Sequence, residues 1–181
     1  RVAGILAAAS NGSGVVGMAP DASLYSLRVC DGSGCLSSRI AQAYQWARQN
    51  GMQVVSVSLA NCGADPDSAV ASQIAQAIGS GVIVVASAGN GTASQWSPGS
   101  PVSGTARLSG TNAVSALLQD YTTPAGYQYG PEVDLAAPTD VITITLGGGT
   151  TVFGGTWAAT PHVAGAAALL LKQGFSSSQV T

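Results

Sequence analysis

The side chains best suited to chemistry gather in residues 155–165, Gly-Thr-Trp-Ala-Ala-Thr-Pro-His-Val-Ala-Gly. His162 is the only histidine of the chain, and imidazole is the side chain that most often accepts a proton in catalysis. Side chains on a helix meet when they are three or four positions apart, whereas His162 follows Trp157 by five. The indole nitrogen of Trp157 is a donor without a usable lone pair, so it cannot attack a carbonyl carbon. We therefore expect a structural role for His162.

The same segment carries a longer pattern. It resembles the nucleophile segment of the subtilisin-like serine peptidases (the subtilases), which reads Gly-Thr-Ser-Met-Ala-x-Pro-His-Val-Ala-Gly. Nine of the eleven positions match, the unrestricted one included, and the departures are Trp157 and Ala158. In that family the serine forms an acyl-enzyme, which requires an oxygen that can be deprotonated and later expelled. The resemblance implies that Trp157 stands at the nucleophile position without the nucleophile's chemistry.

The resemblance extends along nearly the whole chain. Further segments similar to the family, in the expected order, are residues 14–20, 54–59, 84–90 and 130–138. The first four residues, Arg-Val-Ala-Gly, look like the end of the family's His-Gly-Thr-His-Val-Ala-Gly segment. The resemblance then implies that the catalytic histidine lies three residues before Arg1 and the aspartate earlier still. We expect residues 1–181 to be one partial domain that lacks its amino-terminal part.

The resemblance also assigns a substrate site. Asn90 corresponds to the oxyanion-hole side chain, although an asparagine after a strand is often only a turn residue, and Asn90-Gly91-Thr92 also matches a glycosylation acceptor. Substrates of the family bind as an extended strand between two backbone edges. The matching residues are Gly32, Ser33 and Gly34 on one edge, Ser58, Leu59 and Ala60 on the other, and Ser87, Ala88 and Gly89 at the pocket floor. Ala60-Asn61 replaces two glycines that are frequent in the family, so the sequence leaves the pocket preference open.

Composition argues against nucleic-acid and membrane partners. Charged residues make up 8% of the chain, the net charge is −2, and the basic residues are dispersed rather than clustered. The longest apolar run, residues 163–171, is about half the roughly 18 residues that a membrane span requires. We therefore expect a soluble chain whose partner is an extended polypeptide substrate or inhibitor, as the resemblance implies. By the same resemblance the protein is extracellular.

Three cysteines are present. Cys30 and Cys35 enclose a glycine-containing loop that a disulfide could close, the alternative being two thiols, and Cys62 is left over in either case. Zinc needs about four converging ligands, which one histidine and no Cys-x-x-Cys pair do not supply, so no metal site is predicted. The loop around Asn11 resembles part of a calcium site, but calcium there would need an upstream carboxylate.

Residues 12–17, Gly-Ser-Gly-Val-Val-Gly, satisfy the dinucleotide-binding pattern G-x-G-x-x-G. That loop must follow a strand and open a helix, whose terminal amides bind the pyrophosphate. Here residues 2–9 have a helical pattern, Pro20 prevents a helix from continuing, and residues 24–29 have a strand pattern. The context is reversed, so nucleotide binding is only a remote alternative.

The periodicity predicts an α/β fold. Apolar runs at 24–29, 54–59 and 82–86 alternate with helical patterns, which is typical of βαβ units and a parallel sheet, and the last two runs are expected at its centre. The resemblance implies a three-layer α/β/α arrangement. The remaining expectations are a helix around Ile40–Ala47 capped by Ser37 or Ser38, a helix at 69–78 capped by Asp67 or Ser68, strands at 133–136 and 141–146, an irregular surface at 92–130 with a strand-like 111–118, and a helix at 156–172.

Two functional hypotheses follow. The resemblance implies a serine endopeptidase domain, in which this chain is inactive because Trp157 replaces the nucleophile and the other catalytic residues lie upstream of Arg1. The alternative is a pseudo-peptidase that acts as a peptide-binding or scaffold module. Restoring serine at position 157 in a completed domain distinguishes the two hypotheses.

Overall fold

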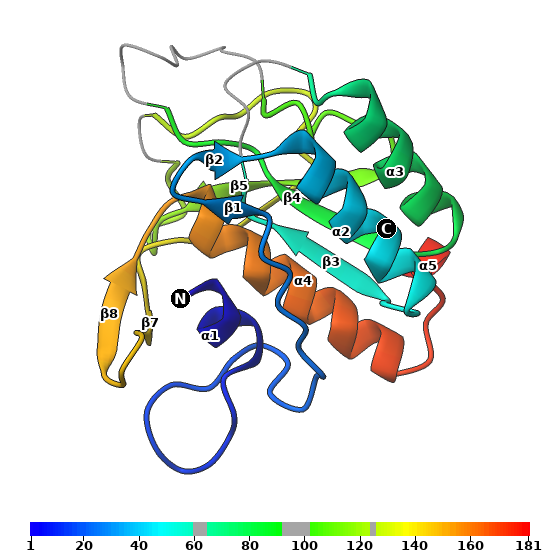
Figure 1. Cartoon of the computed structure of the whole chain (residues 1–181). Helices are drawn as coiled ribbons and strands as arrows, with labels where there is room; N and C mark the ends of the chain where they lie inside the picture. Colours follow the sequence, from blue (N-terminus) through cyan, green and yellow to red (C-terminus); the bar gives the residue numbers. More distant parts are fainter. Residues whose placement is uncertain (60–64, 92–101, 124–125) are drawn as a thin grey trace.

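The computed structural model describes residues 1–59, 65–91, 102–123 and 126–181. Four parallel strands form the central sheet in the order β3-β4-β5-β6. Helix α4 covers one face of this sheet, and α2 and α3 cover the other (Figure 1). The elements are α1 (Val2–Ala7), β1 (Cys30–Asp31), β2 (Gly34–Cys35), α2 (Ser37–Gln49), β3 (Val54–Val57), α3 (Ser68–Gly79), β4 (Ile83–Ser87), β5 (Thr111–Leu117), β6 (Leu135–Pro138), β7 (Val141–Ile144), β8 (Thr150–Phe153), α4 (Thr156–Lys172) and α5 (Ser177–Val180).

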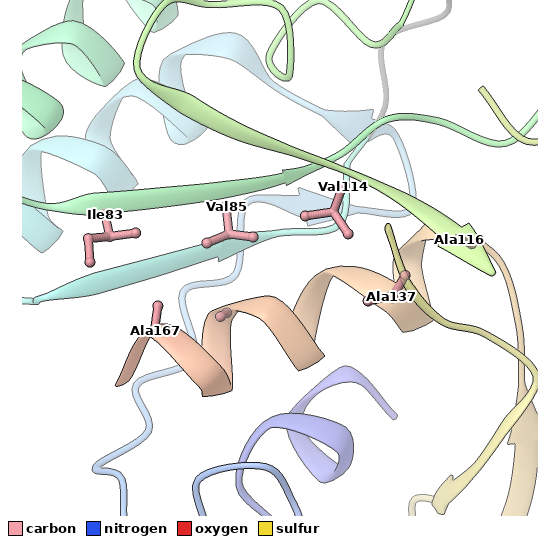
Figure 2. Close-up of a cluster of buried hydrophobic side chains, with 8 residues drawn as sticks. Ile83, Val85, Val114, Ala116, Ala137 and Ala167 are labelled. Atoms are coloured by element: carbon pink, nitrogen blue, oxygen red, sulfur yellow. The ribbon is translucent and has the colours of Figure 1, made fainter. Parts of the chain in front are cut away.

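Strand β4 is buried on both faces because its side chains alternate between two helical layers. Ile83 and Val85 pack toward α4 together with Val114 of β5 (Figure 2). Val84 points to the opposite face, where it packs with Ile74 of α3. The core therefore lies on both sides of β4, and the three-layer prediction is confirmed.

Several element boundaries agree with the sequence. Helix α4 spans Thr156–Lys172, as predicted, and α3 begins at the cap Asp67, whose carboxylate accepts a hydrogen bond from the Ala69 N–H at 2.9 Å. Helix α2 ends at Gln49, shortly before Gly51, which adopts a φ of 68°. The start of α2 differs from the prediction, because Leu36 stands at the N-cap and no side chain caps the helix.

The prediction of a strand at 24–29 is wrong, because the structure assigns no strand there. These residues have no strand partner among the described parts of the chain, and a strand requires a neighbour for its backbone groups. The prediction that β3 is central is also wrong, since β3 ends the four-stranded sheet. Both errors concern the same edge of the molecule.

The region expected to be irregular surface contains part of the core. Strand β5 pairs with β4 and β6, and Val102 and Ala106 are buried against it. The burial of this region was not predicted from the sequence, because serine, threonine and glycine fill many of its positions. Strand β8, which pairs with β7 across the glycines at 147–149, was not predicted at all.

Candidate functional site

The site is built around the first residues of α4. Gly155 is the N-cap and adopts a φ of 90°, a conformation that favours glycine. A Cβ at this position would lie 2.7 Å from Asn90 Nδ2. The Gly155 N–H also donates to Thr139 Oγ1 at 2.7 Å. Gly155 therefore allows the start of α4 to approach the asparagine that follows β4.

Asn90 is oriented by Thr156. Its Oδ1 accepts from the Thr156 N–H at 2.7 Å and from Thr156 Oγ1 at 2.8 Å. Thr156 Oγ1 in turn accepts from the Gly89 N–H at 3.2 Å. The oxygen of the Asn90 amide is bound to these donors, while its nitrogen donates to no acceptor in the part of the chain that the structure describes.

Trp157 is held through its main chain. In a regular helix the Trp157 carbonyl oxygen would accept a hydrogen bond from the N–H of residue 161, but Pro161 has no N–H. Instead Ser58 Oγ, just beyond the end of β3, donates to the Trp157 carbonyl oxygen at 3.3 Å. The Trp157 N–H lies in the first turn, where helical amides have no intrahelical acceptor. Its side chain is 41% exposed, so the indole is not part of the core.

The structure brings together part of the predicted site. Ser58, Gly89 and Asn90 are linked to Thr156 and Trp157 by hydrogen bonds, while Ser87 and Ala88 are fully buried beside them in the chain. Leu59 continues the segment after β3. Ala60 lies outside the described residues.

Gly32, Ser33 and Gly34 lie in the hairpin formed by β1 and β2. The Cys30–Cys35 disulfide closes this hairpin, which decides between the two alternatives that the sequence left open. Asp31 accepts from the Ser33 N–H at 2.9 Å and from Ser33 Oγ at 2.5 Å, and it forms an ion pair with Arg39 of α2. These bonds, first of all that from the Ser33 hydroxyl, lower the pKa of Asp31 to about 2. Among the described residues, no hydrogen bond joins the hairpin to Asn90 or Trp157.

The contacts of His162 are those of a residue with a structural role. Its Nδ1 lies 2.9 Å from the Ala158 carbonyl oxygen of the same helix. Burial lowers the pKa of the imidazole, while the backbone carbonyls of Ala158 and Ala159 oppose that shift. The side chain is therefore biased toward the neutral form and bonded within α4, in agreement with the geometric argument from sequence.

Three residues of this arrangement were not named as site residues from sequence. Gly155 and Thr156 are the first two residues of the motif at 155–165. The motif could therefore have indicated them as site residues. Thr139 comes from the turn after β6, and only the folded chain shows that its hydroxyl bonds to Gly155. No sequence signal pointed to it.

The described residues contain no group of three histidine, cysteine, aspartate or glutamate side chains that could hold a metal ion. Asn11 Oδ1 accepts from the Ser13 N–H at 3.1 Å, which is an ordinary turn contact. A calcium ion at this loop would need further oxygen ligands. The glycine pattern at 12–17 lies in bends and irregular backbone, and no helix begins after it before α2. No described helix is long and apolar enough to cross a membrane.

Comparisons with known proteins show which proteins this chain is similar to. The chain is 41% identical to Subtilisin BL of Lederbergia lenta and 42% identical to Alkaline elastase YaB of Bacillus sp. (strain YaB). Each alignment covers 99% of this chain but only 65% and 46% of those proteins, respectively. Among solved structures, Sphericase matches with a TM-score of 0.84 and S41 Psychrophilic Protease with 0.85, each at 29% identity over 99% of this chain and 65% of theirs.

The chain thus spans less than two thirds of the length of these relatives. The model of the subtilase family matches residues 1–180. With a match over nearly every residue and a fold shared with solved relatives, the chain belongs to the subtilase family.

Proposed function

We propose that this chain is part of a subtilisin-like serine endopeptidase domain whose binding groups are present but which does not itself hydrolyse peptides. The observation that carries the proposal is Trp157 at the first turn of α4, beside the oriented amide of Asn90. The fold and the family support the parent activity. Tryptophan at position 157, in place of the nucleophilic serine, supports the loss of that activity.

Asn90 Nδ2 and the Trp157 N–H are the proposed oxyanion donors. The Asn90 amide is turned so that its oxygen bonds to Thr156, which leaves its nitrogen available to a ligand. The Trp157 amide lies at a helix N-terminus, where the macrodipole favours a negative charge. Two such donors stabilise the oxygen that becomes negative when an acyl carbon turns tetrahedral.

The nucleophile and its base are what the chain lacks. Indole cannot form an ester with an acyl group, because it has no oxygen or thiolate to attack with. His162, the only imidazole, is bonded to the Ala158 carbonyl oxygen of its own helix. Hydrolysis would therefore require a serine at position 157 and a base from outside these residues.

The proposed ligand is an extended polypeptide, a substrate or an inhibitor, lying between the segment that begins with Ser58 and Leu59 and the hairpin residues Gly32–Gly34. Backbone edges recognise any peptide by adding it as a strand. An indole in place of a hydroxymethyl group occupies space next to the scissile bond, so we expect weak binding by the chain as it stands. The Cys30–Cys35 disulfide supports an extracellular location, since such bonds persist in oxidising compartments.

A chimera tests this proposal: residues 1–181 replace the matched region of Subtilisin BL, so that the relative supplies the rest of the domain. With Trp157→Ser we expect cleavage of a fluorogenic peptide, and with Trp157 retained we expect none. A folded Trp157→Ser chimera that fails to cleave would favour the pseudo-peptidase alternative, a peptide-binding or scaffold module. Cleavage by the chimera that retains Trp157 would refute the proposed inactivity.

A further inference from the structure

Three asparagines of the chain stand directly before a glycine: Asn11, Asn50 and Asn90. In such a pair the glycine nitrogen attacks the side-chain carbonyl carbon of the asparagine, and glycine has no side chain that hinders the attack. The new N–C bond replaces the bond to the side-chain nitrogen, which leaves as ammonia with the proton of the attacking amide. Water then opens the cyclic imide to aspartate or isoaspartate. Asn90 therefore combines a proposed oxyanion donor with a pair of residues that is prone to lose that donor.

The attacking nitrogen of the Asn90-Gly91 pair is bound in the folded chain. The Gly91 N–H donates to the Gly126 carbonyl oxygen at 2.6 Å. On the other side of Asn90, the Gln128 N–H donates to the Gly89 carbonyl oxygen at 3.0 Å. These two bonds form an isolated antiparallel bridge that fixes the backbone on both sides of Asn90. While the bridge is closed, the Gly91 nitrogen is occupied and cannot turn toward the side chain.

The carbon that would be attacked is held as well. Asn90 Oδ1 accepts from the Thr156 N–H at 2.7 Å and from Thr156 Oγ1 at 2.8 Å. An attack by Gly91 requires the Asn90 amide to rotate away from both donors. The bridge to Gly126 and the start of α4 therefore restrain the two reacting groups separately.

Asn11 has weaker restraints than Asn90. Both Asn11 and Gly12 are exposed, in a stretch of bends. The Asn11 side chain accepts a hydrogen bond from the exposed Ser13 N–H at 3.1 Å. In the part of the chain that the structure describes, no hydrogen bond occupies the Gly12 N–H. Asn11 thus serves as an unprotected reference within the same polypeptide.

Asn50 is the third case. It is the C-cap of α2, where its Nδ2 donates to the Trp46 carbonyl oxygen at 2.9 Å. The Gly51 N–H donates to the Arg48 carbonyl oxygen at 3.4 Å. These contacts belong to the end of a helix and do not involve the bridge at Gly126. Asn50 therefore reports opening elsewhere in the fold.

We propose that Asn90 is a protected deamidation site, which converts to aspartate or isoaspartate when its bridge to Gly126 and its bonds to Thr156 open. The reaction needs water and no other reagent. The opening is reversible, whereas the conversion is permanent. A transient local opening of the site is thus recorded in the covalent structure of the chain.

The consequence for the site rests on the proposed function. An ionised carboxylate accepts hydrogen bonds and donates none, so aspartate at position 90 removes the Nδ2 donor. It also places a negative charge where the negative oxygen of a tetrahedral intermediate would form. Its oxygens can still accept from Thr156, so the scaffold stays as it is. Isoaspartate adds a carbon to the main chain and displaces Gly91 from the bridge.

The experiment incubates the 181-residue chain at mildly alkaline pH in heavy-oxygen water and follows each asparagine by peptide-mapping mass spectrometry. In the folded chain, Asn90 should convert about tenfold more slowly than Asn11, or more slowly still, because its reaction waits for a local opening. In urea the two sites should convert at similar rates, since both precede glycine.

Gly126→Ala tests the bridge. An added Cβ there would lie 2.5 Å from the Gly91 carbonyl oxygen, so the variant should open the bridge and speed the conversion of Asn90 several-fold. Gly148→Ala is the matched control. The φ angles of Gly126 and Gly148 are 95° and 94°, but no atom lies within 4 Å of a Cβ added at Gly148.

Thr156→Val is a second variant, for the case that Gly126→Ala does not fold. It removes the bond from Thr156 Oγ1 to Asn90 and leaves the bridge in place, and it should also speed the conversion of Asn90. Its control is Thr145→Val, which removes a hydroxyl bond to the Gly148 carbonyl oxygen instead. In every variant the rate at Asn11 should stay unchanged.

The proposal is overturned if Asn90 converts as fast as Asn11 in the folded chain, or if it stays slow in urea. Equal effects of a variant and its control on Asn90 would also overturn it. So would an equal rise at Asn50 and Asn90, because the variant would then loosen the whole fold. These rates are measured without turnover and do not depend on peptidase activity. In the Trp157→Ser chimera, activity should fall in proportion to the fraction of Asn90 converted, and full activity after conversion would count against the oxyanion role alone.

Discussion

Gly155 shows how closely single residues determine this site. Its positive φ and its short approach to Asn90 Nδ2 are separate demands, one on backbone conformation and one on space. A nearby glycine, Gly148, meets only the first demand, because its φ is 94° and no atom lies within 4 Å of an added Cβ. Substitutions at Gly155 and Gly148 can therefore be compared as a matched pair, which differs only in the space available to a new side chain.

We predict that Gly155→Ala destabilises the chain by more than Gly148→Ala. Both variants place alanine at positive φ, a strain of about 1–3 kcal/mol. Only Gly155→Ala also displaces the Asn90 amide, which adds steric strain and disturbs the bonds to Thr156. Urea unfolding midpoints of the two variants measure the difference, and equal losses would contradict the close approach.

The imidazole of His162 gives a pH prediction. Burial lowers its pKa below the ordinary value of 6.5, so the folded chain binds fewer protons than the unfolded chain when the pH falls through that value. Stability must then decrease on acidification below about pH 6.5, and it is fully present above that pH. Among the described groups, Asp31 with its pKa of about 2 acts only at much lower pH.

We predict that His162→Gln reduces the loss of stability between about pH 7 and about pH 5, because glutamine does not titrate and its amide can still donate to the Ala158 carbonyl oxygen. Thermal midpoints at both pH values test this. If the variant and the unchanged chain lose the same amount of stability, His162 is not the group responsible.

At the scale of elements, the β1–β2 hairpin depends on cross-links more than on pairing. Each of its strands has two residues, so a ladder this short contributes little by itself. The disulfide and the Asp31–Arg39 ion pair hold it instead. The proposed substrate edge at Gly32–Gly34 therefore depends on an oxidised bond.

We predict that the double variant Cys30→Ser, Cys35→Ser destabilises the chain by about 2 kcal/mol and, in the Trp157→Ser chimera, raises KM more than it lowers kcat. The reason is that an unclosed loop must be ordered when the peptide binds. Steady-state kinetics of the chimera measure both constants. Ser33→Ala, which keeps the disulfide but removes a bond to Asp31, is the control and should change KM less. An unchanged KM in the double variant would show that the hairpin is not part of the substrate site.

The elements also show what could be predicted from the sequence. Helix α4 and the Asp67 cap could be located because apolar periodicity and capping side chains are local signals. Residues 24–29 satisfy the same local rules but form no strand, since pairing depends on a neighbour that local rules do not supply. The burial of β5 was underestimated because threonine, serine and asparagine stand in it.

The site was predicted unevenly for the same reason. Motif positions predicted site roles for Asn90 and Trp157, and Thr156 connects these two residues in the fold. The hydrogen bond from Thr139 to the start of α4 joins residues 16 positions apart in sequence, and no local pattern marks it. Contacts between distant elements were the part that required the structure.

At the scale of the whole molecule, the centre of the sheet is enclosed, while its edge at β3 is open. Strand β4 lies between two neighbours and two helical layers, whereas β3 has a neighbour on one side only among the described residues. Apolar side chains are uncovered near this open edge, among them Leu24, Tyr25 and Leu27. Stability should therefore be distributed unevenly across the sheet.

We predict an alternating pattern of amide exchange along β3 in the isolated chain. Val55 and Val57 N–H groups bond to β4 and should exchange slowly, while the N–H groups of Val54 and Ser56 face away from β4 and should exchange faster. Val84 and Val85 of β4 are the internal control, because both should be slow. NMR-detected exchange measures each residue. Uniformly slow exchange in β3 would show that its outer edge is already paired.

The way in which the fold holds Trp157 has an evolutionary consequence. The carbonyl oxygen of this residue is bonded to Ser58, while its ring lies partly in solvent. Any side chain could present the same carbonyl, and a single base change interconverts a serine codon and the tryptophan codon. In a domain that also supplies the base, selection for or against proteolysis can thus act at this codon alone, in either direction, without a compensating change in the scaffold.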